Sequence, residues 1–270
     1  MRAFLLGAAL LATACGSNDP AVSTDAMSPT DSTAPTDSTD PDDAAVIARD
    51  KDELATILAA HLRAEFPVQL IAAQLSRGTY PDGFQLTGTG VSGLEYTGIG
   101  ATGSLSFSFS YFCHGEALPG DPPIPCDAAA HHSHFTLALT GSQTMGDISM
   151  TAIDRVVVWE IRDLALGKAR ISGPDALSLD TSVSTEGVQA DYHLTFDAAY
   201  NQVRYLAGQA VPTFGTIAFT VTSDRTRGDD VRTFESTAQL TYGGNAAPST
   251  IVLDGVTYGF DVAAGTVVRL

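Results

Sequence analysis

From about residue 84 onward, the chain repeats an alternation of apolar and polar residues that suits β-strands. The segment SLSFSFSYF at 104–112 shows it most clearly, because large apolar residues occupy every second position and serines lie between them. Successive side chains of a strand point to opposite faces, so the pattern predicts a strand with one buried face. The same alternation, or a long apolar run, occurs at 134–140, 148–161, 191–196, 216–221, 231–242 and 250–262.

Turn residues separate these segments at intervals of about 10–20 residues. No helical segment alternates with them, which excludes a parallel α/β fold. We therefore predict a mainly β fold of about ten antiparallel strands, arranged as a sandwich or as a half-open barrel. The segment 148–161 is apolar on both faces in its middle, so it is expected to be a central strand.

A helical segment precedes the strands. Within 44–66, residues four apart are mostly apolar, namely Val46, Asp50, Leu54, Leu58, Leu62 and Phe66. This spacing places them on one face of a helix. Pro67 predicts the end of that helix. The next segment, 68–76, is expected to be a second short helix, with a strand as the alternative.

The chain is strongly acidic, with a formal net charge of −17. The segment 46–270 alone carries 24 acidic residues against 13 Lys and Arg residues. Such a charge repels the phosphates of nucleic acids, so we expect no nucleic-acid partner. It also disfavours electrostatic attraction to an anionic membrane surface.

The first 15 residues, MRAFLLGAALLATAC, resemble the signal peptide of bacterial lipoproteins. One arginine precedes an apolar run, and small residues lead to Cys15. The resemblance implies that residues 1–14 are removed and that the thiol of Cys15 is lipidated, which anchors the protein in a membrane. Because Gly16 follows the cysteine where Asp would imply retention at the inner membrane, the resemblance implies the outer membrane. An ordinary secretory peptide is the alternative.

The segment after the cysteine has the composition of a flexible tether. It is rich in Ser, Thr, Asp and Pro, and it repeats PTDST at 29–33 and at 35–39. Without bulky apolar residues, such a segment cannot repay the entropy cost of ordering. We predict a lipidated cysteine and a disordered acidic tether over 15–45, followed by a single β-rich domain over 46–270.

The segment CHGEALPGDPPIPCDAAAHHSH at 113–134 carries the sharpest chemical pattern of the chain. It connects two consecutive strands that are expected to pair as a hairpin. With Cys15 lipidated, Cys113 and Cys126 remain as one pair, and an oxidising compartment favours a disulfide between them. Closing a loop of about 14 residues contributes about 3 kcal/mol in the chain-entropy model.

The same segment supplies four candidate metal ligands, His114, His131, His132 and His134. On a strand, His132 and His134 share one face and His131 takes the other, while His114 lies across the hairpin. Imidazoles placed in this way suit Zn²⁺ or Cu²⁺, with Glu116 or Asp127 as a further ligand. Two alternatives stay open. The histidines are simply polar residues at the mouth of a hairpin, or both cysteines stay reduced and act as ligands.

Other motif matches are interpreted as chance. GxGxxG occurs twice within 88–103, but dinucleotide binding needs a helix directly after the motif, and strands and turns are expected there. The Arg-Gly-Asp tripeptide at 227–229 lies in a polar hairpin tip. Acidic residues on strands could pair in space for glycoside hydrolysis, namely Asp154, Glu160 and Asp163. No catalytic residue is assigned, and an enzyme is not the favoured reading.

The predicted function is a non-catalytic binding or structural role for a lipid-anchored protein of the bacterial cell envelope. A small apolar ligand or a protein is the expected partner, and no cofactor is expected. The aromatic face of 104–112 could line a cavity, although such a face more often belongs to a core. The alternative is a metal-binding envelope protein, including a metal-dependent enzyme, that holds zinc or copper at the four histidines.

Overall fold

The computed structural model describes residues 41–90, 93–115, 122–185, 187–244 and 247–270. The predicted signal peptide, Cys15 and the tether up to residue 40 lie outside the described residues. The described chain is mainly β with one N-terminal helix, as predicted. Among these residues, none of the helices has both the length and the apolar character that crossing a membrane requires.

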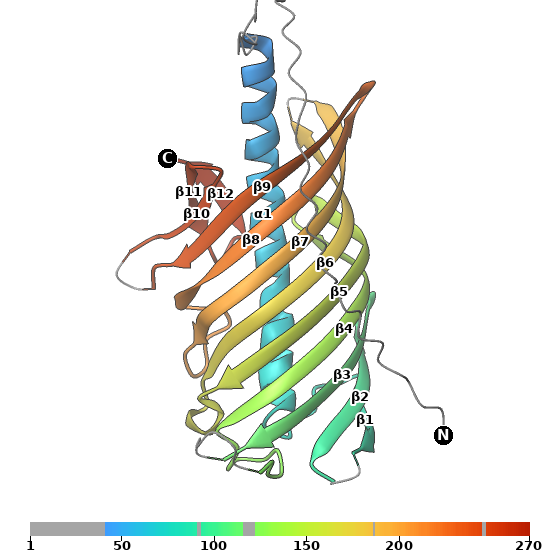
Figure 1. The fold of residues 1–270 in the computed structure, drawn as a ribbon, viewed down its shortest axis with the longest axis vertical. Coiled ribbons are helices and arrows are strands. Elements are labelled where there is room, and N and C mark those ends of the chain that lie inside the picture. Colours follow the sequence, from blue (N-terminus) through green and yellow to red (C-terminus); the bar gives the residue numbers. More distant parts are fainter. Residues whose placement is uncertain (1–40, 91–92, 116–121, 186, 245–246) are drawn as a thin grey trace, which may run out of the picture. The chain divides into compact units, whose positions relative to one another are not determined.

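One helix, α1, spans Pro41–Leu75, and a short 3₁₀ helix spans Leu164–Leu166. The strands are β1 (Phe84–Thr89), β2 (Glu95–Thr102), β3 (Leu105–His114), β4 (His132–Met145), β5 (Ile148–Arg162), β6 (Ala169–Thr185), β7 (Val188–Tyr205), β8 (Phe214–Arg227), β9 (Asp230–Tyr242), β10 (Ser249–Leu253), β11 (Val256–Asp261) and β12 (Thr266–Arg269). They form one antiparallel sheet in which every strand pairs with its neighbours in chain order. The sheet curves around α1 as an open half barrel (Figure 1).

The helix α1 fills the inner side of the curved sheet (Figure 1). Its predicted apolar face is buried, since Leu54, Leu58 and Leu62 are fully inaccessible to solvent. Polar residues of α1 are buried too, among them Glu53 and Glu65. A helix that is buried on most sides is enclosed rather than laid on a surface. Thus α1 supplies one side of the core and the inner face of the sheet supplies the other.

The prediction that the helix ends at Pro67 is wrong, because α1 continues through Pro67 to Leu75. The helix also begins at Pro41, so residues 41–45, predicted as the end of the tether, belong to α1. A proline inside a helix removes one backbone hydrogen bond and costs about 3 kcal/mol. Pro67 itself is exposed, whereas Val68 and Leu75 beyond it are buried against the sheet. Burial of these apolar residues offsets the cost, so the expected second helix is the last part of α1.

The strands also differ in detail from the prediction. The segment 250–262 forms two strands, β10 and β11, joined by a tight turn in which Asp254 and Gly255 have positive φ angles. The segment 88–103 lies in and around the hairpin of β1 and β2. A strand follows it, not a helix, so the arrangement needed for dinucleotide binding is not formed.

The predicted central strand is β5, the fifth of the twelve, and both of its edges are paired. Its inner residues, Val157 and Trp159, are buried. Its outer residues, Val156 and Val158, are 48% and 49% exposed. Although both faces of β5 are apolar in its middle, only the inner face is buried within the described structure.

A cluster of buried charges joins α1 to the middle of the sheet. Arg155 of β5 donates to both carboxylate oxygens of Asp175 on β6, at 2.9 and 2.6 Å, and it also donates to Glu65 of α1. Tyr200 of β7 donates to the same Glu65. Burial alone would raise the pKa of Glu65, but Arg155, His61 and the hydrogen bond from Tyr200 hold it below its ordinary value. Glu65 is therefore an ionised partner for Arg155.

A second buried cluster lies nearer the start of α1. Arg227 of β8 approaches Glu53 at 2.5 Å, and Tyr192 of β7 donates to Glu53 at 2.7 Å. Arg225 lies 3.3 Å from Asp50 and is fully buried. The arginine of the Arg-Gly-Asp tripeptide thus points to α1, and 9% of its side chain is exposed.

Arg155→Met should destabilise the domain by about 3–5 kcal/mol, because it leaves two buried carboxylates without their cation. Urea unfolding followed by circular dichroism measures the loss. Arg162→Met is the matched control, since Arg162 pairs with Glu160 at the surface and such pairs contribute about 0–1 kcal/mol. Equal losses in the two variants would contradict the assigned role of Arg155.

Acid should destabilise the domain through His61, which stacks on Phe196 beside Glu65. Burial lowers the pKa of His61 to about 4 from an ordinary value of 6.5; Glu65 opposes this shift, and Arg155 adds to it. Between these pH values the unfolded chain binds a proton that the folded chain does not, so stability falls as the pH falls. The shift corresponds to about 3 kcal/mol.

His61→Phe should remove this part of the pH dependence when urea unfolding is compared at pH 7 and pH 4.5. His193→Phe, at an exposed histidine of β7, should keep the wild-type dependence. If His61→Phe loses as much stability in acid as the wild type, His61 is not the group responsible.

Candidate metal-binding site

Three of the four predicted histidines converge on the outer face of the sheet, the face turned away from α1. His114 ends β3 and His132 begins β4, and the two lie directly opposite each other in the antiparallel register. His134 follows on the same face of β4, as the period of two predicts. We call His114, His132 and His134 the triad.

The triad is compact enough to share one ion. The rings of His114 and His132 stack with centroids 4.8 Å apart, and His134 meets both rings edge-on. One ring nitrogen of each lies within 4.8 Å of the others. Three nitrogens bound to a single zinc at about 2.0–2.1 Å would lie about 3.4 Å apart. Small side-chain rotations close that difference.

The remaining predicted ligands do not join the triad. His131 lies just before β4, and its exposed side chain is outside the group. Its backbone N–H donates to the carbonyl of His114, which ties together the two strand ends. Asp127 accepts a hydrogen bond from the backbone N–H of Ala129 within the loop. Glu116 lies outside the described residues.

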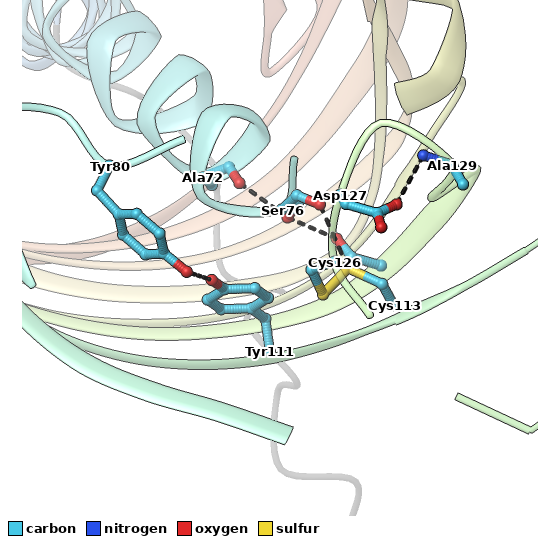
Figure 2. Close-up of a disulfide and its surroundings, with 9 residues drawn as sticks. Ala72, Ser76, Tyr80, Tyr111, Cys113, Cys126, Asp127 and Ala129 are labelled. Carbon is cyan, nitrogen blue, oxygen red and sulfur yellow. Dashed lines mark hydrogen bonds between the residues drawn. A yellow bond between two sulfur atoms is a disulfide. The ribbon is translucent and has the colours of Figure 1, made fainter. Parts of the chain in front are cut away.

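The predicted disulfide between Cys113 and Cys126 is present on the inner side of the same hairpin, near the end of α1 (Figure 2). The Sγ atom of Cys113 lies 3.3 Å from the carbonyl oxygen of Ser76. Ser133, which lies between His132 and His134, donates from its hydroxyl to that of Ser76 at 2.7 Å. Both strands are thus fixed from the inside directly beneath the triad.

With the disulfide formed, both thiols are consumed. The alternative in which reduced cysteines act as metal ligands is therefore not the one in the structure. Cys113 also faces inward and is fully buried, whereas His114 faces outward, so the two residues lie on opposite faces of the sheet. The candidate ligands that the structure groups here are the three imidazoles of the triad.

The electrostatic environment keeps His132 in the form that binds metals. Burial lowers its pKa, and so do His114, Arg162 and His134, while Glu160 raises it. A lowered pKa leaves the imidazole neutral at pH 7, with a lone pair available for a cation. His134 is exposed and the other two imidazoles are partly buried, so an ion has direct access from solvent.

Phe112 supports the triad from the neighbouring position on β3. It lies opposite His134 in the register, and their rings stack with centroids 4.9 Å apart. It also meets the ring of His114 edge-on at 5.4 Å. The aromatic ring restricts the rotamers of both imidazoles, which lowers the entropy cost of bringing them together.

Asp154 and Glu160, two of the acids considered for glycoside hydrolysis, do not form a catalytic pair. Asp154 and Glu160 lie on the same strand, and six residues of strand span about 20 Å, well beyond the separations that such enzymes use. Glu160 pairs with Arg162 and Asp163 pairs with Arg170.

The aromatic face of 104–112 belongs to the core. Phe107, Phe109 and Tyr111 are buried and lie in ring contacts with other aromatic residues of the core. A described cavity beside α1, lined by His61, Glu65 and others, measures about 20 Å³. That volume holds about one water molecule. An acyl chain therefore does not fit there.

A groove of about 780 Å³ lies instead on the outer face, across β5 to β10. Small and apolar side chains form much of its lining, including Val156, Val158, Ala199, Ala218 and Val252. No described lysine or arginine lines it. The groove offers an apolar contact surface that is separate from the triad.

Comparison of the chain with protein-family models, with curated proteins and with solved structures gives no match.

Sequence analysis did not predict that Arg155 joins a buried charge cluster with Glu65, or that Glu160 and Arg162 lie beside the triad. Arg155 could have been found, since it shares the inward face of β5 with Val157 and Trp159. The positions of Glu160 and Arg162 beside the triad depend on the register between β4 and β5, which a single sequence does not specify.

Proposed function

We propose that the protein is a lipid-anchored protein of the bacterial cell envelope whose β domain binds Zn²⁺ or Cu²⁺ at the triad. The observation that carries the proposal is the convergence of three imidazoles from two strands on one outer face. Imidazole is a preferred ligand of both ions, and three such ligands leave a position for water or a fourth group.

Three features support metal binding over a chance cluster of polar residues. Burial and the neighbouring histidines lower the pKa of His132, which favours its neutral form, and the backbone beneath the triad is fixed by the disulfide and by Ser133. The ligands also lie on strands rather than on a loop, which limits how far they move. Binding, not catalysis, is the proposed role.

The envelope location rests on the N-terminal resemblance to lipoprotein signals, with Cys15 as the lipidated residue. Such a compartment is oxidising, which agrees with a disulfide between Cys113 and Cys126. The small apolar ligand or protein partner stays a prediction, and the outer groove is where we would place it.

Elemental mass spectrometry should find about one zinc or copper per chain in protein purified under oxidising conditions without a histidine tag. His132→Ala and His134→Ala should each weaken metal binding at least about tenfold, because each removes a ligand. His131→Ala is the matched control and should bind as the wild type does. Substoichiometric metal that is insensitive to His132 and His134 would overturn the proposal.

Intact-mass analysis of the mature protein should show a chain that starts at Cys15 and carries lipid on its thiol. Cys15→Ala should accumulate as the unprocessed precursor without lipid, because the thiol is the acceptor. A mature chain that starts at another residue, or one that starts at Cys15 without lipid, would contradict the predicted anchor.

A further inference from the structure

Two charged residues of β5 lie beside the triad on the same outer face. In the antiparallel register, Glu160 is directly opposite His134, and Arg162 is directly opposite His132. On this face, His132 and His134 of β4 therefore have His114 of β3 on one side and the carboxylate and guanidinium of β5 on the other.

Glu160 is not part of the compact triad, but its register position places it within reach of a metal held there. Directly opposed residues of an antiparallel pair have Cβ atoms about 4.5–5.5 Å apart, a gap that a glutamate side chain can span. In the structure Glu160 is turned along its own strand, and its Oε1 atom lies 2.7 Å from Nη2 of Arg162. Both side chains are partly exposed, at 29% and 48%, so their pairing is weak and easily exchanged.

Arg162 opposes a bound cation in two ways. It holds the carboxylate of Glu160, and its own positive charge lies across from His132. A divalent ion at the triad would attract Glu160 and repel Arg162. The ion and the guanidinium thus compete for one carboxylate.

On the basis of the proposed function, we propose that Glu160 is the fourth protein ligand of the metal at the triad, and that Arg162 sets the affinity of the site by competing for Glu160. Binding of the ion breaks the ion pair between Glu160 and Arg162 and forms a bond from the carboxylate to the metal. Three imidazoles and one carboxylate make a four-coordinate set suited to zinc, with Arg162 as its competitor.

The test is a double-mutant cycle on Zn²⁺ affinity. The full-length protein, with its disulfide intact, is titrated with zinc against a chromophoric chelator as wild type, Glu160→Gln, Arg162→Gln and the double variant. Glu160→Gln should weaken zinc binding at least about tenfold, because it removes a ligand. Arg162→Gln should tighten binding several-fold, and it should lose most of this effect when Glu160 is already replaced.

Glu235→Gln is the matched control, since it removes an exposed carboxylate from β9 and should leave zinc affinity unchanged. Wild-type affinity in Glu160→Gln would overturn Glu160 as a ligand while leaving the triad intact. Independent effects of the two substitutions would overturn the competition, because general electrostatics would then explain both. A wild-type protein that does not bind zinc or copper would overturn the proposed function itself, and this inference with it.

Discussion

A curved antiparallel sheet has an apolar inner face that must be covered, and here a single helix covers it. The burial of α1 determines nearly everything else in the described domain. It explains why the helix passes through Pro67, since the residues beyond the proline still have a surface to cover. It also explains why Glu53 and Glu65 of α1 are paired with arginines of the sheet, because these carboxylates are buried in the core and need a cation there.

The triad depends on this core, although it lies on the opposite face. Each strand near it alternates between a residue that contacts the interior and a residue that faces out. Cys113 and Ser133 are fixed against the end of α1, and the histidines next to them in sequence are thereby fixed on the outside. A change in how α1 ends would therefore alter the spacing of the imidazoles without touching them.

The class of the fold and the three histidines of the triad could be predicted from the sequence, because both depend on local periodicity and on the pairing of consecutive strands. A period of two identified most of the long strands and placed His132 and His134 on one face. The hairpin at 113–134 placed His114 across from them. The rest depends on forces that local patterns do not contain. Pro67 predicts the end of the helix, but the helix continues because the residues after it are buried against strands that are distant in the sequence. The position of Glu160 and Arg162 beside the triad depends on the register with β4, which the sequence alone does not specify.

The order of elements along the chain has a consequence for folding. The strands form a meander, in which each strand pairs with the one made just before it, so the sheet can grow by local steps. The helix α1 is made first, yet its contacts include β12 at the far end of the chain. Contacts between distant parts of a chain are slow to form. Because α1 packs on strands that are made after it, from β4 to β12, its apolar sides stay uncovered until those strands have formed.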